Sequence, residues 1–335
     1  MATLDLLAPD TPLGTARVDL GSALDLYAAW PKPTVIVSDG AYGVAGFPGD
    51  PPTPRGLGVW YEPHIEAWAR FALPSTTLWF WNTEVGWANV HPILEKHGWV
   101  YRACHTWDKG VAHVAGNVNG DTIRRFPTVT EVCVQYVRDV RLPLAGGAEL
   151  PLKEWLRAEW KRTGLPLSLT NEAAGVKNAA TRKYFTADHL WYFPPPEVIP
   201  LLAAYATAHG QPSGWPYFSI DGQHAISSDE WKRLRAKWNH VHGVTNVWRE
   251  PANRGAERVR GADGQFVHTN QKPLHLMDLI IGASSDPGDI VWEPFGGLCS
   301  AALSAGLLGR HGYAAEILPD FQAVALIRLE AALAR

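Results

Sequence analysis

Short apolar runs separated by glycine and proline turns dominate the first part of the chain and predict buried strands. These runs cover residues 34–37, 77–81 and 132–137. Longer mixed stretches over 61–72 and 85–96 have the spacing of helices, and His97-Gly98 suits the end of the second one. Residues 16–145 therefore predict an alternating strand and helix half of a doubly wound α/β sheet.

The alternation resumes after Gln271. It predicts helices over 274–281, 300–308 and 321–333, with strands at 289–292 and 313–317. The strand at 289–292 enters the turn Gly296-Gly297 before a helix, an arrangement that lets backbone N–H groups approach a ligand. Glu316, about twenty residues later, has the spacing of an acid that binds ribose hydroxyls. A tight connection without a ligand would show the same pattern.

The pattern changes between residues 146 and 265. Proline, tryptophan and basic residues become frequent, strand alternation fades, and several short helices are expected. We therefore expect one α/β domain built from 1–145 and 266–335. The mostly helical segment 146–265 would be inserted into it.

Composition limits the classes of function. The chain has 335 residues and 46% hydrophobic content, enough for one large domain and an insertion. Its apolar runs are shorter than the roughly 18 residues that span a bilayer, and a secretion signal is not recognisable, so a cytoplasmic protein without membrane contact is expected. The cysteines and histidines lack the spacing of metal ligands, so no metal is expected.

The charge distribution is uneven although the formal net charge is only −3. Lysine and arginine concentrate over 153–183 and 231–260, where they could neutralise phosphates. A solvated helix face would have the same composition.

A candidate reactive group follows the first predicted strand. Residues 34–37 run directly into Ser38-Asp39-Gly40-Ala41-Tyr42. Ligands of open α/β sheets bind at the carboxyl ends of the strands. Asp39 could therefore accept hydrogen bonds from an amine, and Tyr42 could stack on a flat ring. A turn capped by an aspartate would look similar.

Together the two α/β halves resemble the DNA amino-methyltransferases of the permuted beta order, which methylate exocyclic amines of adenine or cytosine. The family's catalytic motif, Asp-Pro-Pro-Tyr or Ser-Pro-Pro-Tyr, is matched at both ends by Asp39-Gly40-Ala41-Tyr42. Its cofactor loop, Asp-Pro-Phe-x-Gly, resembles Glu293-Pro294-Phe295-Gly296-Gly297. Val18-Asp19-Leu20 and the segment His268-Thr-Asn-Gln-Lys272-Pro273 resemble its other cofactor segments.

The resemblance implies a Rossmann-like fold, S-adenosylmethionine as cofactor and double-stranded DNA as substrate. Asp39 and the carbonyl of Gly40 would accept the amine protons, and Tyr42 would stack on a base flipped out of the duplex. The residues implied in cofactor binding are Asp19, His268, Lys272, Pro273, Glu293, Phe295, Gly296, Gly297 and Glu316.

Three positions depart from the family pattern. Gly40 and Ala41 replace the two prolines, and Cys299 stands where the family has glycine. A catalytically degenerate DNA-binding protein, or a methyltransferase for RNA or small molecules, is therefore an alternative. Asp39 at the first motif position favours adenine N6, while the adjacent Ser38 keeps cytosine N4 open. The loop 46–52 could close over a base or be an ordinary surface loop.

Target recognition is expected from the inserted segment. Residues 169–184 predict a helix, a glycine turn and a second helix, which is the arrangement that presents polar side chains to a major groove. A helix pair without DNA contacts is the competing interpretation. The resemblance also leaves open a cognate restriction endonuclease and a homodimer as partners. The expected DNA-reading residues are Lys177, Asn178, Thr181, Arg182 and Lys183.

Overall fold

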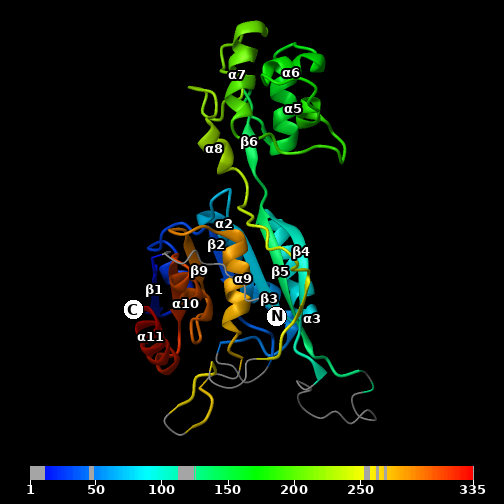
Figure 1. The fold of residues 1–335 in the computed structure, drawn as a ribbon. Coiled ribbons are helices and arrows are strands. Elements are labelled where there is room, and N and C mark those ends of the chain that lie inside the picture. The colour runs from blue at the N-terminus through cyan, green and yellow to red at the C-terminus, as the bar shows by residue number, and fades with distance from the viewer. Residues whose placement is uncertain are drawn as a thin grey trace. The chain divides into compact units, whose positions relative to one another are not determined.

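The computed structural model describes residues 12–44, 49–111, 124, 126–252, 257–261, 264–267 and 270–334. The chain forms two compact units, one from Met1–Arg138 with Ala236–Arg335 and one from Asp139–Arg235 (Figure 1). The second unit thus starts at Asp139 rather than 146 and ends at Arg235 rather than 265. The segment after Arg235 belongs to the first unit because its strand β8 pairs with β4.

An eight-stranded sheet is the centre of the first unit. Its strands lie in the order β1-β10-β9-β2-β3-β5-β4-β8. The first five are mutually parallel, β5 is antiparallel to β3 and β4, and β8 is parallel to β4. This confirms the expected α/β class. The bounds are β1 Thr15–Leu20, β2 Val35–Ser38, β3 Thr77–Asn82, β4 Trp99–Asp108, β5 Thr130–Arg138, β8 Val247–Arg249, β9 Ile290–Glu293 and β10 His311–Glu316.

Helices cover both faces of this sheet. Alternate residues of β3 enter different cores: Leu78 and Phe80 pack with residues of α2 and α3, whereas Trp79 and Trp81 pack with residues of α9 and α10. Burial on both faces explains why the central strands are continuous apolar runs. The bounds are α1 Ala23–Leu26, η1 Pro54–Gly56, α2 Leu57–Phe71, α3 Glu84–Lys96, α9 Leu274–Ser284, α10 Ser300–Leu307 and α11 Pro319–Leu333.

The second unit is mostly helical and has its own core. Trp155, Trp160, Phe218 and Trp231 are among its buried side chains. The buried carboxylate of Glu159 accepts hydrogen bonds from the Phe218 amide and the Arg162 guanidinium. The elements are β6 Arg141–Pro143, β7 Glu149–Pro151, α5 Leu152–Arg162, η3 Leu167–Leu169, α6 Thr170–Ala173, η4 Thr181–Phe185, α7 Val198–His209 and α8 Ser228–Lys232.

The expected pair of helices over 169–184 is wrong in its second half. Helix α6 has only four residues, and after Gly175 the chain does not become helical again until the short 3₁₀ turn η4. Asn178 has φ of 54°, a left-handed conformation that interrupts a helix. The Thr181 hydroxyl is hydrogen-bonded to Thr170 and Asn171, 2.7 and 2.5 Å away, which fixes the loop.

In the parts of the chain that the structure describes, no helix combines the length and apolar character needed to cross a membrane.

Candidate active site

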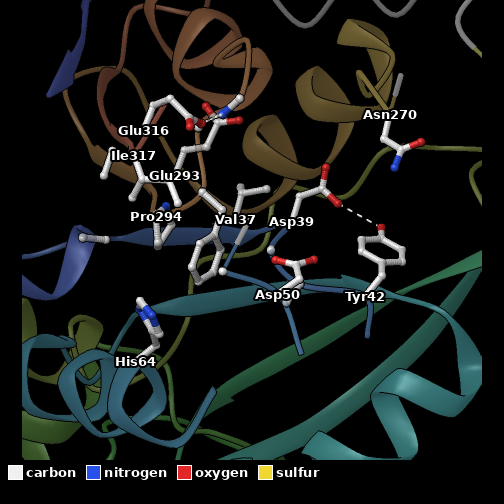
Figure 2. Close-up of a pocket in the computed structure, with 18 of the residues that line it drawn as sticks. Val37, Asp39, Tyr42, Asp50, His64, Asn270, Glu293, Pro294, Glu316 and Ile317 are labelled. Atoms are coloured by element: carbon white, nitrogen blue, oxygen red, sulfur yellow. Dashed lines mark hydrogen bonds between the residues drawn. The ribbon is translucent and has the colours of Figure 1, made fainter. Parts of the chain in front are cut away.

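A cavity of about 640 Å³ opens at the carboxyl ends of the parallel strands. The turn after β2, the loop after β9 and the end of β10 line it, together with Glu131 of β5 and the residues preceding α9. Figure 2 shows Asp39 and Asp50 between Tyr42 and the side chains of Glu293 and Glu316. Both motif regions that the sequence singled out therefore contribute to one site.

Glu293 at the end of β9 fixes the start of the loop that lines the cavity. Its side-chain oxygens accept hydrogen bonds from the amides of Ala301 and Ala302, at 3.1 and 2.7 Å. The carboxyl group thus caps helix α10, whose first N–H groups have no partners within the helix. Burial raises the pKa of Glu293 to about 8, with the two amides opposing that shift.

The glycines of this loop are required by close packing. A Cβ on Gly296 would lie 2.9 Å from the Ala315 carbonyl oxygen and 3.0 Å from Cys299 Sγ. Gly297 has φ of 51°, and its amide donates to Glu316 Oε2 at 2.7 Å. The loop therefore lies directly against the end of β10.

Cys299 is also left-handed, with φ of 56°, and is fully buried. This backbone conformation costs a non-glycine residue roughly 1–2 kcal/mol, which explains glycine in the resembling family. Burial raises the pKa of the Cys299 thiol well above its usual value. The thiol group packs beside Gly296 and leaves the loop's path intact.

Glu316 presents a carboxylate to the cavity from the end of β10. Oε2 accepts from the Gly297 amide and Oε1 from the Leu318 amide, at 2.7 and 2.8 Å. These two backbone donors orient the group, while burial raises its pKa. An oriented acceptor here suits the hydroxyls of a sugar.

Five polar side chains meet at the other side of the cavity. The hydroxyl of Tyr42 lies 2.9 Å from Asp39 Oδ1 and 3.0 Å from Glu131 Oε2. Lys272 Nζ lies 2.8 Å from the same Asp39 oxygen and 3.3 Å from the same Glu131 oxygen. Lys109 pairs with the second oxygen of Glu131. We call these residues the charged corner.

The protonation states within the charged corner follow from its charges. Burial, together with the two neighbouring carboxylates, raises the pKa of Tyr42 well above its usual value, so its hydroxyl remains a donor. Burial alone would raise the pKa of Glu131, but Lys272 and Lys109 outweigh it and lower the value. Burial alone would lower the pKa of Lys272, but the carboxylates of Asp39 and Glu131 outweigh this effect and raise the value.

Gly40 departs from the family motif for a steric reason. A Cβ at this position would lie 2.6 Å from Phe295 Cδ2 and 2.7 Å from the Tyr61 hydroxyl oxygen. The missing prolines are compensated by hydrogen bonds: the Ala41 carbonyl accepts from Asn82 Nδ2 at 2.9 Å and from the Tyr61 hydroxyl at 3.1 Å. The turn after β2 is thereby fixed without a proline ring.

Phe295, in the loop after β9, packs against aromatic side chains of helix α2. Its ring centroid is 5.2 Å from Trp60 and 4.9 Å from His64. Burial lowers the pKa of His64 to about 4, so this imidazole is neutral near pH 7. Its Nδ1 is hydrogen-bonded to the Tyr27 hydroxyl at 2.9 Å.

Not every residue expected to bind cofactor lines the cavity. Asp19 instead accepts a hydrogen bond from Trp30 Nε1 and pairs with Arg17, because its strand directs it away. Pro273 is the N-cap of α9. Lys272 lies in the charged corner, and His268 lies outside the described residues.

Thr181 is unsuited to contact DNA, because its side chain is buried. The other four expected DNA-reading residues retain accessible surface: Lys177, Asn178 and Arg182 are exposed, and Lys183 is half-buried.

Sequence reasoning missed several residues of the cavity. Glu131 lies just outside the strand predicted over 132–137, although a glutamate beside such an apolar run is an unusual residue to bury. Asp50 also lines the cavity, whereas residues 45–48 of its loop lie outside the described part. Asn82 ends β3 and Lys109 follows β4; neither lines the cavity, but both lie at the carboxyl ends of strands, where ligand-binding groups are expected.

Fold and site together define a doubly wound α/β protein with a nucleotide-type ligand pocket and an adjacent acidic reaction centre. The DNA methylase model for N6/N4 methyltransferases matches residues 53–326. The chain therefore belongs to this family, which confirms the resemblance drawn from its motifs.

Two relatives share short regions with the chain. DNA adenine methyltransferase YhdJ of Escherichia coli (strain K12) is 38% identical over 96 residues, which are 28% of this chain and 31% of the relative. Type II methyltransferase M.HinfI of Haemophilus influenzae is 36% identical over 66 residues, or 20% and 18% of the two chains. The aligned regions thus span less than a third of either relative.

Solved structures support the fold over nearly the whole chain. The M1.HpyAVI–SAM complex matches with a TM-score of 0.51 at 15% identity, covering 93% of this chain and 98% of the other. The cytosine-N4-specific PvuII DNA methyltransferase matches with a TM-score of 0.51 at 11% identity, covering 96% and 89%. At such identities the likeness concerns the fold alone.

Proposed function

We propose that this protein transfers a methyl group from S-adenosylmethionine to an exocyclic amine of a DNA base, with adenine N6 as the target. One observation carries the proposal: Asp39, the loop after Glu293 and the side chain of Glu316 line the same cavity. Membership of the DNA methylase family supports the substrate class. The curated adenine methyltransferase relative and the aspartate at position 39 favour adenine.

The cavity fits a cationic nucleoside cofactor. Among the described residues, its lining carries five carboxyl groups, of which Glu293 retains its proton near pH 7, and one ammonium group, so it favours a positively charged ligand. Glu316 would accept from ribose hydroxyls, and the loop at Gly296 and Gly297 would let the cofactor lie close to the backbone. Phe295 would contact its apolar parts. When bound, S-adenosylmethionine supplies an electrophilic methyl group on a sulfonium.

Asp39 would activate the amine. Hydrogen bonds from the amine to the Asp39 carboxylate and the Gly40 carbonyl would draw its lone pair out of conjugation with the ring. The amine nitrogen would bond to the methyl carbon as the carbon–sulfur bond of the cofactor breaks, with that electron pair leaving on sulfur. Asp39 would share the positive charge that develops on nitrogen and take one of its protons.

Tyr42 would contact the flipped base with its ring, since its hydroxyl is bonded to Asp39 and Glu131. Base flipping is needed because the amine of a paired base is inaccessible to such a cavity. An aromatic face would replace part of the stacking that the base loses.

Basic residues of both units would contact DNA. In the second unit, Lys177, Asn178, Arg182 and Lys183 remain the proposed readers. In the first, residues 259–261 pair antiparallel with residues 264–267, and Arg258 and Arg260 stack on the Phe266 ring, 3.6 and 4.1 Å from its centroid. The cognate endonuclease and the homodimer stay predictions from the resemblance.

Methyl transfer can be tested with the purified chain, labelled S-adenosylmethionine and duplex DNA of mixed sequence. Mass spectrometry of the nucleosides should find N6-methyladenine. Asp39→Ala should lower the rate by about 10²–10³-fold, the usual effect of removing one such polar group. Asp25→Ala, on an exposed position of α1, is the control. N4-methylcytosine alone would contradict adenine, and unlabelled DNA would contradict methyl transfer.

A further inference from the structure

Lys272 is a buried lysine in a site built from carboxylates. Its side chain is 4% exposed, and its ammonium lies over the rings of Tyr42 and Trp81, 5.2 and 5.6 Å from their centroids. A buried charge is costly unless it is paired, and Asp39 and Glu131 supply the pairing. The position therefore has a structural reason to retain its positive charge.

The contacts of Lys272 distinguish the two oxygens of Asp39. Oδ1 accepts from the Tyr42 hydroxyl and from Lys272 Nζ, at 2.9 and 2.8 Å. Oδ2 has no hydrogen-bond partner among the residues that the structure describes. One oxygen is thus held by the protein while the other is available to a ligand.

The charged corner is balanced as a set of four groups. Two carboxylates, Asp39 and Glu131, face two ammonium groups, Lys272 and Lys109. Without Lys272, both carboxylates would still surround the Tyr42 hydroxyl, with Lys109 bonded only to the far oxygen of Glu131. Two neighbouring carboxylates in a buried site favour binding of a proton.

We propose that Lys272 is a positioning residue for methyl transfer, which holds Asp39 by Oδ1 so that Oδ2 faces the amine. The inference rests on the proposed function. It assigns Lys272 to the reaction centre instead of the cofactor-binding role expected from the sequence.

Loss of Lys272 would change the pH dependence of methyl transfer. The ionisable groups around Asp39 include Tyr42 and Asp50 after β2, Tyr61 of α2, Glu131 and Cys133 of β5, Glu293 of β9, Lys109 and Lys272. Removing Lys272 deletes the cation closest to Asp39 and leaves the Asp39 and Glu131 carboxylates as neighbours, an arrangement that favours binding of a proton. Since the ionised form accepts the amine proton, the acidic limb of the rate profile moves to higher pH.

The test compares Lys272→Met, Lys272→Arg and Lys237→Met in the full chain. Lys237 pairs with Asp286 and Asp289 outside the cavity and is the matched control for losing an ammonium group. Single-turnover methylation of DNA, measured from pH 5 to 9, should fall by about 10²-fold in Lys272→Met at neutral pH. The acidic limb should shift upward, Lys272→Arg should restore most of the rate, and S-adenosylmethionine affinity should change less than about threefold.

The opposite pattern would overturn the inference: a loss of S-adenosylmethionine affinity in Lys272→Met with an unchanged rate at saturating cofactor. A direct readout does not depend on activity. The ¹³C chemical shift of the Asp39 carboxyl group, assigned with Asp39→Asn, should differ between the wild type and Lys272→Met at neutral pH and change little in Lys237→Met. An unchanged shift in Lys272→Met contradicts the inference even in an inactive protein, whereas absence of methylation by the wild type contradicts only the proposed function.

Discussion

The turn at Gly40 is fixed by contacts that differ from those of the family motif. The family motif stiffens this turn with prolines, whereas here the Phe295 ring occupies the space beside position 40 and Asn82 and Tyr61 hold the Ala41 carbonyl. The shape of the turn therefore depends on tertiary contacts. A substitution at position 40 acts on both the catalytic turn and the cofactor loop.

We predict that Gly40→Ala lowers methylation activity at least tenfold, because the added Cβ displaces the Phe295 ring, an overpacking that costs roughly 1–3 kcal/mol. Phe295→Leu frees part of that space. The double variant Gly40→Ala/Phe295→Leu should therefore lose less activity than the free-energy effects of the two single substitutions predict when added. Initial rates of the four proteins form a double-mutant cycle. Additive effects would show that the two residues are not in contact.

Glu293 gives stability a pH dependence. Its folded-state pKa is about 8 against an ordinary 4.5, so the folded protein retains a proton that the unfolded chain loses between these values. Relative to Glu293→Gln, the wild type should therefore lose stability as pH rises from 4.5 to 8, by on the order of 1 kcal/mol per unit. Urea unfolding at pH 5, 6, 7 and 8 measures the difference between the two proteins. A difference that stays constant with pH would exclude this contribution.

Elements that arise from local sequence patterns were predictable. The strands β2, β3, β5 and β9 are apolar runs because both sheet faces are covered. Helix α3 ends at Lys96, and Gly98, with φ of 75°, follows its cap as the sequence indicates. Strand β8 has only three residues and lies at the edge of the sheet, paired with β4 among the described residues. So short a strand gives no pattern in the sequence, which is why the prediction places this segment in the inserted region.

Other features depend on contacts between distant residues. The second helix expected before Tyr184 fails because the Thr181 side chain bonds to α6 and Asn178 turns left-handed. Lys272 and Glu131 are in contact although they lie far apart in the sequence, and no local pattern predicts such a contact. Two of the five residues of the charged corner, Glu131 and Lys109, therefore could not be singled out from the sequence.

The paired segments 259–261 and 264–267 allow a test at the scale of one element. Gln271 in the cavity wall bonds to the Val259 amide and the Glu257 carbonyl, which fixes the first of these segments to the site. Arg260→Gln should weaken binding to all duplex sequences and reduce the slope of log affinity against log salt by about 1. Arg102→Gln, on β4, is the comparison. An unchanged slope would mean that Arg260 does not contact a phosphate.

At the scale of the whole molecule, we expect cofactor binding in the first unit and DNA sequence preference to depend on the second. All residues that line the cavity belong to the first unit, whose segments flank the second in sequence. Replacing 139–235 with a flexible linker should therefore preserve S-adenosylmethionine affinity within about threefold and reduce DNA sequence preference. Calorimetry measures the first and competition between duplexes the second. Loss of cofactor binding in a folded protein would refute this division.

Pairing of β1 with β10 has a consequence for synthesis of the chain. Thr15 and His311 are hydrogen-bonded neighbours although 296 positions separate them. Strand β1 leaves the ribosome early but acquires its partner only after β10 has been translated, and β9 also arrives late to β2. The sheet edge at β1 stays unpaired meanwhile, and such pairings between distant segments form slowly. The cofactor loop between β9 and α10 is consequently among the last parts of the protein to assemble.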